Sequence, residues 1–549
     1  MLATPPEMIV KNRFLGFLIW QSIPSSAIFL LFKTFISTIS STTSTSTSSS
    51  SRSRNPLITY APSLITLLTF FTFHLSQLLF SASLSLLSSP HPHRPAYPFE
   101  LILGLVRFLL VSDSSSASVP VDFRLRAKVS LSFVLFVAAC AVSGMLGMVS
   151  MCWVKSSGFA VEWVIRGFGV GLLYGLVYIY KRRWVLEFPI IQRPPFFSFK
   201  MGLPSATTRA FTLSGVAYLF SAVLGAILPD PFKSHVTVRK YIAEQIIFWI
   251  GSFAVFLCWE LSHHLHRVLH TKRFTFAPPK GSAAAETNPS EHLLSALEES
   301  NRSSLLQYLA YLDLCMVCEN NVDTWRRAAF YEETGETYKR VTAVCLRPLE
   351  ELALKLAEGL ESNVDKTSQL SNQLLSPADS RLESKHWEPL NNFQLCAWCA
   401  RTVASLTAGS HKEDRCGVAQ LSGSNAAVIS TLLSCLLAVE TFMGKKTNVQ
   451  SPSHLMGPAG IKWATLSTRR IEVAVAKKRG GPLHSKAYAV ADVLRTSIYN
   501  IVSAFHDEML NSAKAGLLEK DWIISGKPLF GSRELLLQKL RLFLDFRAS

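Results

Sequence analysis

Residues Val129–Trp153 read VSLSFVLFVAACAVSGMLGMVSMCW, a run without a single Asp, Glu, Lys or Arg. A hydrocarbon core about 30 Å thick needs about 20 predominantly apolar residues of helix to cross it. Helix is required because every backbone polar group must find its hydrogen-bond partner inside the segment. This stretch therefore predicts a helix that spans a membrane.

Five further stretches are long and apolar enough for the same interpretation, and all lie in residues 1–273. They are Phe14–Phe32, Leu57–Phe80, Val161–Tyr180, Ala210–Leu228 and Ile242–Leu261. A seventh apolar run, Phe99–Val111, is too short to span and carries Arg107. We interpret it as an interfacial helix, with a re-entrant segment as the alternative. The sequence thus predicts an all-α fold that begins with a polytopic bundle of six transmembrane helices.

The chain of 549 residues is both apolar and basic. Hydrophobic residues make up 49%, charged residues 17%, the mean hydropathy is +0.25 and the formal net charge is +17. Such a composition excludes a disordered chain, a collagen-like fibre and a small disulfide scaffold. Residues 1–273 carry 24 Lys and Arg against 9 Asp and Glu, whereas residues 274–549 carry 31 against 29. The basic excess therefore belongs to the apolar half, which favours membrane loops over a direct nucleic-acid site.

The distribution of basic residues also predicts the orientation of the bundle. Six spans leave 16 Lys and Arg, up to residue 273, on one side of the membrane and 7 on the other. Because cytoplasmic loops are the richer in Lys and Arg, both termini are expected on the cytoplasmic side. The tract Ser37–Ser53, in which 15 of 17 residues are Ser or Thr, is interpreted as a flexible loop, with its role and any modification left open.

The second half of the chain predicts a soluble helical domain. Residues 274–290 are interpreted as a linker, and residues 291–549 as an α-helical cytoplasmic domain in which hydrophobic residues recur at 3.6-residue spacing. Pro348 is expected to kink or break one long helix. The predicted helices are Glu291–Glu299, Ser303–Glu319, Thr324–Tyr331, Thr337–Leu360, Asn391–Ser405, Ala426–Met443, Lys486–Ser512 and Arg533–Phe546.

Other parts of this half have weaker periodicity. Polar segments near 361–388, 407–423 and 444–460 are interpreted as loops or disorder. Alternating Ile471, Val473 and Val475 form the single strand candidate, flanked by basic residues that we interpret as a solvated face.

Small residues four apart suggest close helix packing in the bundle. Gly171-x-x-x-Gly175 lies in one predicted span and Ser221-x-x-x-Gly225 in the next. Such spacing lets two helix backbones approach. Packing within the chain is the preferred interpretation, and self-association is the alternative.

One histidine cluster is a candidate metal-binding site. His263, His264, His266 and His270 follow Glu260 at the end of the last span, where membrane-bound di-iron oxidases or hydroxylases also place histidines. Such enzymes need several clusters, so a basic juxtamembrane helix is the preferred interpretation. Ionisable residues are scarce within the spans, which argues against the second alternative, a polytopic small-solute transporter.

No other pattern in the sequence indicates an active site. Cys315/Cys318 and Cys396/Cys399 are two Cys-x-x-Cys pairs, but they lie far apart in apolar helical contexts, which favours buried structural thiols over a zinc site. Phosphate-binding loops and nucleophile elbows are absent from the sequence. We therefore expect no enzyme, no cofactor and no metal site.

The most distinctive sequence lies between Tyr308 and Glu358. It contains LAYLDLCMVCENNVDTWRRAAFYEE, followed by YKRVTAVCLRPLEELALKLAEGL. The buried-helix core Leu312-Asp313-Leu314, the polar turn and the Arg-Arg-aromatic sequence after it resemble the nuclear division cycle (Ndc) transmembrane nucleoporin family. The candidate partner-contact or motif residues are Asp313, Trp325, Arg326, Arg327 and Phe330.

This resemblance implies a function in the nuclear pore. It implies an integral nuclear-envelope protein that anchors the pore scaffold in the membrane and supports pore assembly. The implied partners are inner-ring scaffold nucleoporins and an Aladin-like propeller protein. Arg326 and Arg327 are interpreted either as docking charges or as members of structural salt bridges.

Overall fold

The computed structural model describes residues 6–44, 64–92, 95, 121–152, 160–189, 192–227, 238–279, 281–298, 304–320, 323–367, 388–448 and 482–548. These residues are overwhelmingly helical, and in the described part the sole β pairing is a one-residue bridge between Ser89 and Val185. The chain divides into two units, Thr4–Lys272 and essentially Arg273–Ser549. The all-α class predicted from the sequence is confirmed.

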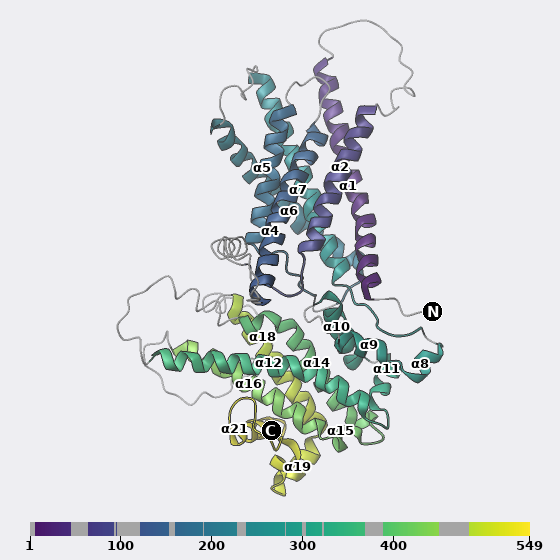
Figure 1. Ribbon diagram of the computed structural model, residues 1–549, viewed down its shortest axis with the longest axis vertical. Coiled ribbons are helices and arrows are strands. Elements are labelled where there is room, and N and C mark those ends of the chain that lie inside the picture. The colour runs from purple at the N-terminus through teal and green to yellow at the C-terminus, as the bar shows by residue number, and fades with distance from the viewer. Residues whose placement is uncertain are drawn as a thin grey trace, which may run out of the picture. The chain divides into compact units, whose positions relative to one another are not determined.

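The first unit is a bundle of six long helices that run side by side (Figure 1). Helix α4 packs on both α2 and α5, and α7 packs on both α1 and α6. The helices are α1 (Pro6–Ser44), α2 (Leu64–Leu87), α4 (Val121–Cys152), α5 (Ala160–Tyr180), α6 (Pro195–Ile227) and α7 (Val238–His270).

Aromatic side chains fill the centre of this bundle. Trp259 of α7 stacks on Phe80 of α2 at a ring-centroid distance of 5.0 Å, and it lies 4.9 Å from the ring of Tyr174 on α5. The outer surface is also apolar: Leu31 is 70% exposed and Phe71 66%. A bundle with large apolar side chains both inside and outside is suited to lipid, because a water-soluble protein rarely exposes extended apolar surface.

Six described helices are long and apolar enough to cross a membrane. Five of them overlap the predicted spans. Helix α6, which covers the remaining predicted span Ala210–Leu228 as far as Ile227, is not among the six. The sixth candidate is Ser424–Gly444, which belongs to the second unit and is the most deeply buried of the six. It packs against other helices of that unit, which fits a central core helix. The candidates are Met8–Thr38, Thr66–Leu87, Arg126–Cys152, Glu162–Tyr180, Ile242–His270 and Ser424–Gly444.

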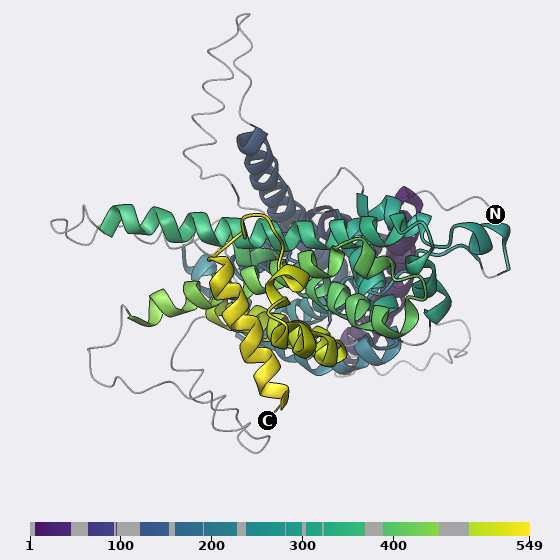
Figure 2. The same ribbon diagram turned by 90° about the horizontal axis from the view of Figure 1, so that it is seen from below.

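The second unit is a compact set of helices around α16, which packs on α12 and α18. Figure 2 shows α12, the long teal-green helix, with one end projecting beyond its neighbours. The elements are α8 (Ala283–Thr287), α9 (Glu291–Glu298), α10 (Leu305–Glu319), α11 (Thr324–Ala328), η4 (Ala329–Tyr331), α12 (Glu336–Thr367), η5 (Glu388–Asn392), α14 (Phe393–Glu413), α15 (Val418–Leu421), α16 (Ser424–Asn448), α18 (Pro482–Ala504), α19 (His506–Lys514), α20 (Leu518–Trp522) and α21 (Arg533–Ala548).

Helix α10 is central, as its sequence predicts. It is buried on nearly all sides, and Ser304 caps its first turn by accepting a hydrogen bond from the backbone N–H of Gln307. The predicted linker is not a free tether, because Phe276 is buried and its backbone N–H donates to Asp313 of α10. The second unit therefore begins at Arg273.

Several sequence-based boundaries were wrong. Helix α1 continues to Ser44, so the first part of the Ser/Thr tract is helical and not a loop. The segments at 361–367 and 444–448 are helical, and α14 continues to Glu413. Thr407 and Ser410 are buried in α14, which shows that packing overrides polar composition there.

Two helix breaks differ from the expectations from the sequence. Helix α12 continues through Pro348, so the break that was one of the two expectations there is absent. The predicted helix Lys486–Ser512 is divided into α18 and α19 at Phe505, whose ring is buried against Trp522 at a centroid distance of 5.2 Å. Four predictions lie outside the described residues: Phe99–Val111, the strand candidate at 471–475, and the loops at 368–387 and 449–460.

Candidate functional site

The predicted packing glycines of α5 lie against α4. A Cβ atom at Gly171 would overlap the backbone of α4, and one at Gly175 would come within 3.2 Å of it. Gly144 of α4 meets Gly167 of α5 just as closely. These glycines let two backbones of the same chain touch. Gly167 was missed from the sequence, although it lies four residues before Gly171 and continues the same spacing.

The second predicted packing pair lies on α6. Ser221 is buried, whereas the surroundings of Gly225 fall outside what the structure describes. The neighbouring Phe220 reaches α5, where a Cβ atom at Gly169 would lie 3.2 Å from its ring. A glycine therefore also sets the contact between α5 and α6.

Glu260 of α7 is buried and fully paired. Arg183, which follows α5, donates from Nη1 and Nη2 to its two carboxylate oxygens at 2.5 and 2.7 Å. The hydroxyl of Tyr178 donates to the backbone oxygen of Arg183 at 3.1 Å. Because the bidentate pair uses both oxygens of Glu260, this carboxylate fixes the loop after α5 and is not a free ligand or base.

The histidines of α7 have separate contacts. Nδ1 of His263 lies 3.1 Å from the hydroxyl oxygen of Tyr178, and Nε2 of His264 lies 3.1 Å from a backbone oxygen of α6. The rings of His266 and His270 stack at 3.8 Å. Within the described residues, no three His, Cys, Asp or Glu side chains group as a metal would require. The di-iron alternative thus has no ligand set in this part of the chain.

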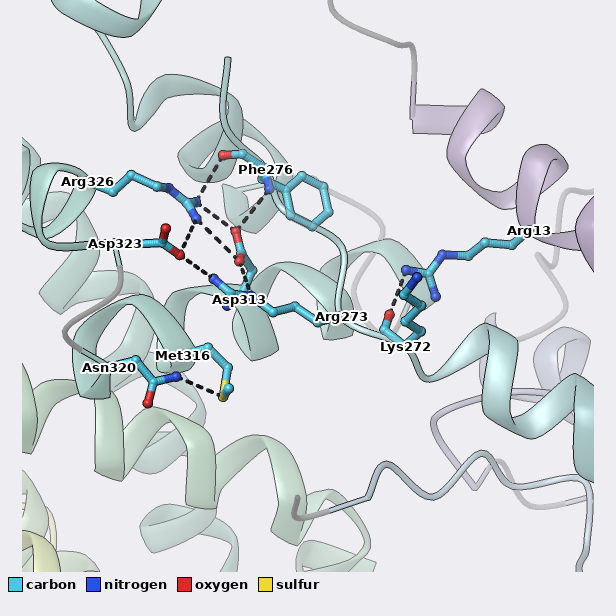
Figure 3. A network of polar contacts seen from close by, with 9 residues as sticks. All are labelled: Arg13, Lys272, Arg273, Phe276, Asp313, Met316, Asn320, Asp323 and Arg326. Atoms are coloured by element: carbon cyan, nitrogen blue, oxygen red, sulfur yellow. Dashed lines mark hydrogen bonds and ion pairs between the residues drawn. The ribbon is translucent and has the colours of Figure 1, made fainter. Parts of the chain in front are cut away.

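Asp313 is the centre of a buried ion network in the second unit (Figure 3). Its Oδ1 accepts from Nε of Arg273 at 2.8 Å, and its Oδ2 accepts from Nη2 of Arg326 at 2.7 Å. Oδ2 also accepts from the backbone N–H of Phe276 at 3.0 Å. The carboxylate therefore holds together α10, α11 and the segment that enters the unit.

Asp323 extends the network at its edge. It accepts from Nη2 of Arg273 at 2.9 Å and lies 4.0 Å from Nη1 of Arg326. Partial burial alone lowers the pKa of Arg273, but the neighbouring Asp313 and Asp323 outweigh it, and the pKa is raised. Two arginines and two aspartates thus form a balanced cluster, in which Arg326 is 3% exposed.

The comparison with protein families shows to which family this chain belongs. The model of the nucleoporin protein Ndc1-Nup matches residues 105–392 and 378–511, a region that includes the Asp313 network and α4 to α7. The chain belongs to the Ndc1-Nup family of nucleoporins. With its apolar helices it is a transmembrane nucleoporin, and the nuclear pore membrane is the location that fits this family. The comparison with curated proteins gave no match.

In this nucleoporin Arg327, the second arginine of the motif, is also buried and paired. Nε and Nη2 of Arg327 donate to the carboxylate of Glu413 at 2.8 and 2.5 Å, and Nη1 donates to the backbone oxygen of Cys318 at 3.1 Å. Arg326 and Arg327 are both buried. Both guanidinium groups therefore serve structural salt bridges, and neither presents a charge for docking. Neither Glu413 nor Arg273 was anticipated, because the sequence carries no local signal for pairing across 40 or 86 residues.

Among the remaining motif residues, one retains accessible surface. Phe330 is buried, whereas Trp325 is partly exposed. The indole N–H of Trp325 is buried and has no hydrogen-bond partner among the described residues. These motif residues thus mainly hold the fold, and Trp325 is the one among them with accessible surface.

The two Cys-x-x-Cys pairs lie in one helical core. Cys315, Cys318, Cys396 and Cys399 are all buried in α10 and α14, and all are free thiols. Burial raises the pKa of Cys315 and of Cys396 to about 12. These thiols are therefore protonated at neutral pH and behave as small apolar side chains.

Proposed function

We propose that this nucleoporin anchors the pore scaffold in the nuclear envelope and supports pore assembly. The observation that carries the proposal is the family match across the bundle and the helical unit together. The bundle supplies an apolar outer surface for lipid, and the helical unit supplies a folded surface for proteins. Protein contact suits the second half, which has nearly equal numbers of basic and acidic residues.

The orientation is part of the proposal. The excess of Lys and Arg on one side of the bundle favours both termini, and hence the helical unit, on the cytoplasmic or nucleoplasmic side. The partners we infer there are inner-ring scaffold nucleoporins and an Aladin-like propeller protein. Their contact sites are expected on the exposed surface of the unit, since Asp313, Arg326 and Arg327 are occupied inside it.

Cross-linking of the full chain in isolated nuclear envelopes tests this function. Exposed lysines of the helical unit, such as Lys339, Lys412 and Lys520, are the reporters. We expect cross-links from these lysines to inner-ring nucleoporins, and we expect depletion of the chain to reduce those nucleoporins at the nuclear rim. Cross-links only to proteins of the envelope lumen, or an unchanged rim after depletion, would contradict the proposal.

A further inference from the structure

An open cavity of about 390 Å³ lies in the first unit, between the start of α6 and the end of α7. Arg193, Arg267 and Lys272 contribute positive charge to its wall, and Pro195, Met201 and Val268 contribute apolar surface. A wall that joins three cations to apolar groups is suited to a ligand with an anionic head and an apolar body.

Within the described part of the chain, two of the three cations have no carboxylate partner, although Nη1 of Arg193 donates to Sδ of Met201 at 2.6 Å. Arg193 and Lys272 are exposed, and neither has an Asp or Glu partner within salt-bridge distance among the described residues. Arg267 is shared, because its Nη2 donates to Oε2 of Glu187 at 3.0 Å. The net charge offered by the wall is therefore positive even after Glu187 is counted.

The backbone around the cavity adds to this positive field. Helix α6, 33 residues long, begins at Pro195 in the wall, and the first N–H groups of a helix carry partial positive charge. The opposite wall is fixed by Arg13 of α1, whose Nη1 donates to the backbone oxygens of Leu269 and His270 at 2.9 and 2.8 Å. Its Nη2 donates to the backbone oxygen of Lys272 at 2.6 Å, as Figure 3 shows. Both walls of the cavity are thus held in place by long helices.

The depth of the cavity favours a lipid over a free anion. The predicted span in α7 ends at Leu261, and a rise of 1.5 Å per residue puts His264 about 5 Å and Arg267 about 9 Å beyond it. Headgroups occupy roughly the first 5–8 Å outside the hydrocarbon on each side. His264, which lines the cavity, therefore lies at the depth of the headgroup layer, and Arg267, which also lines it, lies at the outer edge of that layer.

We propose that this cavity binds the phosphate-bearing headgroup of an anionic phospholipid on the cytoplasmic side of the bundle. Arg193 and Lys272 contact the phosphate, and Met201 and Val268 contact the glycerol and the first part of the acyl chains. The inference goes beyond the proposed anchor function. If the wild-type chain fails to bind the lipid but still gives a normal nuclear rim, the cavity proposal alone is refuted. If it binds the lipid but gives no nuclear rim, the anchor proposal alone is refuted.

The test uses the full chain in phosphatidylcholine nanodiscs, with dioctanoyl phosphatidylinositol 4-phosphate as the probe and native mass spectrometry as the readout. The double variant Arg193→Gln with Lys272→Gln is expected to bind about thirtyfold more weakly, from about fivefold for each charge. The matched control, Lys181→Gln with Arg182→Gln, removes two exposed charges before the same loop but outside the cavity. It is expected to stay within about twofold because exposed, distant charges are screened.

A second variant separates shape from charge. Met201→Trp fills the mouth of the cavity without changing any charge, so it is expected to abolish probe binding as well. Equal weakening by the control pair, or full binding by Met201→Trp, would overturn the proposal, since either result indicates diffuse attraction. Inositol 1,4-bisphosphate, which has the same phosphates but no acyl chains, is tested in parallel as a soluble ligand. If it binds as tightly as the lipid, the cavity is a site for a free phosphate ligand and not for a lipid headgroup.

Discussion

The hydroxyl of Tyr311 donates a hydrogen bond of 3.1 Å to the backbone oxygen of Val344. Val344 lies four residues before Pro348, which has no N–H to offer that oxygen. Tyr311 of α10 thus replaces the missing helical donor of α12. This relationship explains why α12 continues through a proline that the sequence suggests as a breakpoint.

Tyr311→Phe is expected to lower the free energy of unfolding by about 1 kcal/mol, because it leaves the partly buried oxygen of Val344 without its donor. The measurement is denaturant unfolding of the full chain in detergent, followed by tryptophan fluorescence. Tyr488→Phe, at an exposed tyrosine of α18, is the control and should have little effect. In a Pro348→Ala background the cost of Tyr311→Phe should shrink, since alanine restores the helical N–H. An unchanged cost in that background would show that the hydroxyl has another role.

Asp313→Asn is expected to destabilise the second unit by about 3–5 kcal/mol, because it leaves buried Arg326 without its full counter-charge. Asp323→Asn, at the more exposed edge of the same network, should cost distinctly less. Thermal unfolding of the purified full chain measures both. Equal losses for the two variants would mean that burial of Asp313 does not set the energy of the network.

Gly171→Val is expected to separate α4 from α5 and to cost at least about 1–3 kcal/mol, since there is no room for a side chain between the two backbones. Gly215→Ala on α6 is the matched control, because a Cβ atom there meets nothing within 4 Å. It should change stability by no more than about 1 kcal/mol. Yield and thermal stability in micelles are the readouts, and tolerance of Gly171→Val would contradict the close crossing.

Only one of the ten cysteines is expected to react quickly with a maleimide in the folded protein. Cys416 is exposed, whereas the other nine are buried. Cys416→Ser should abolish the fast phase, as counted by mass spectrometry after brief labelling. A fast phase that survives this substitution would show that at least one of the nine buried thiols is accessible in the folded protein.

The same thiols predict a loss of stability in alkali. The folded state keeps the Cys315 and Cys396 thiols protonated up to a pKa of about 12, whereas their ordinary value is 9.0. The unfolded chain therefore releases these protons first, and stability is full below pH 9 and falls as the pH rises toward 12. Unfolding midpoints measured between pH 7 and pH 11, compared with those of Cys315→Ala, test this. The variant should show a shallower decline above pH 9.

The sequence predicts the bundle well, because each span is a continuous local signal. It also predicts α10, whose apolar residues surround the helix. Boundaries that depend on partners distant in the sequence were missed. The run to Glu413 in α14 is one example: the hydroxyl of Tyr331 donates to the backbone oxygen of Leu406 at 2.6 Å, and Arg327 pairs with Glu413.

The motif residues show the same limit. Asp313, Arg326 and Arg327 are recognisable as a pattern, but their roles depend on Arg273 and Glu413, which nothing in the local sequence connects to them. The cavity beside α7 was not predictable from the sequence either, because its charges come from the loop before α6 and from the end of α7. Sequence periodicity reports burial within one helix, whereas ion pairs and cavities depend on how several helices meet.

The central claim is that this chain is a membrane anchor of the nuclear pore. Its most direct test is the distribution of the full chain carrying a fluorescent tag at its C-terminus, imaged at native expression level with a scaffold nucleoporin as reference. We expect a punctate nuclear rim that coincides with the reference. A uniform reticular, plastid or plasma-membrane signal would contradict the claim.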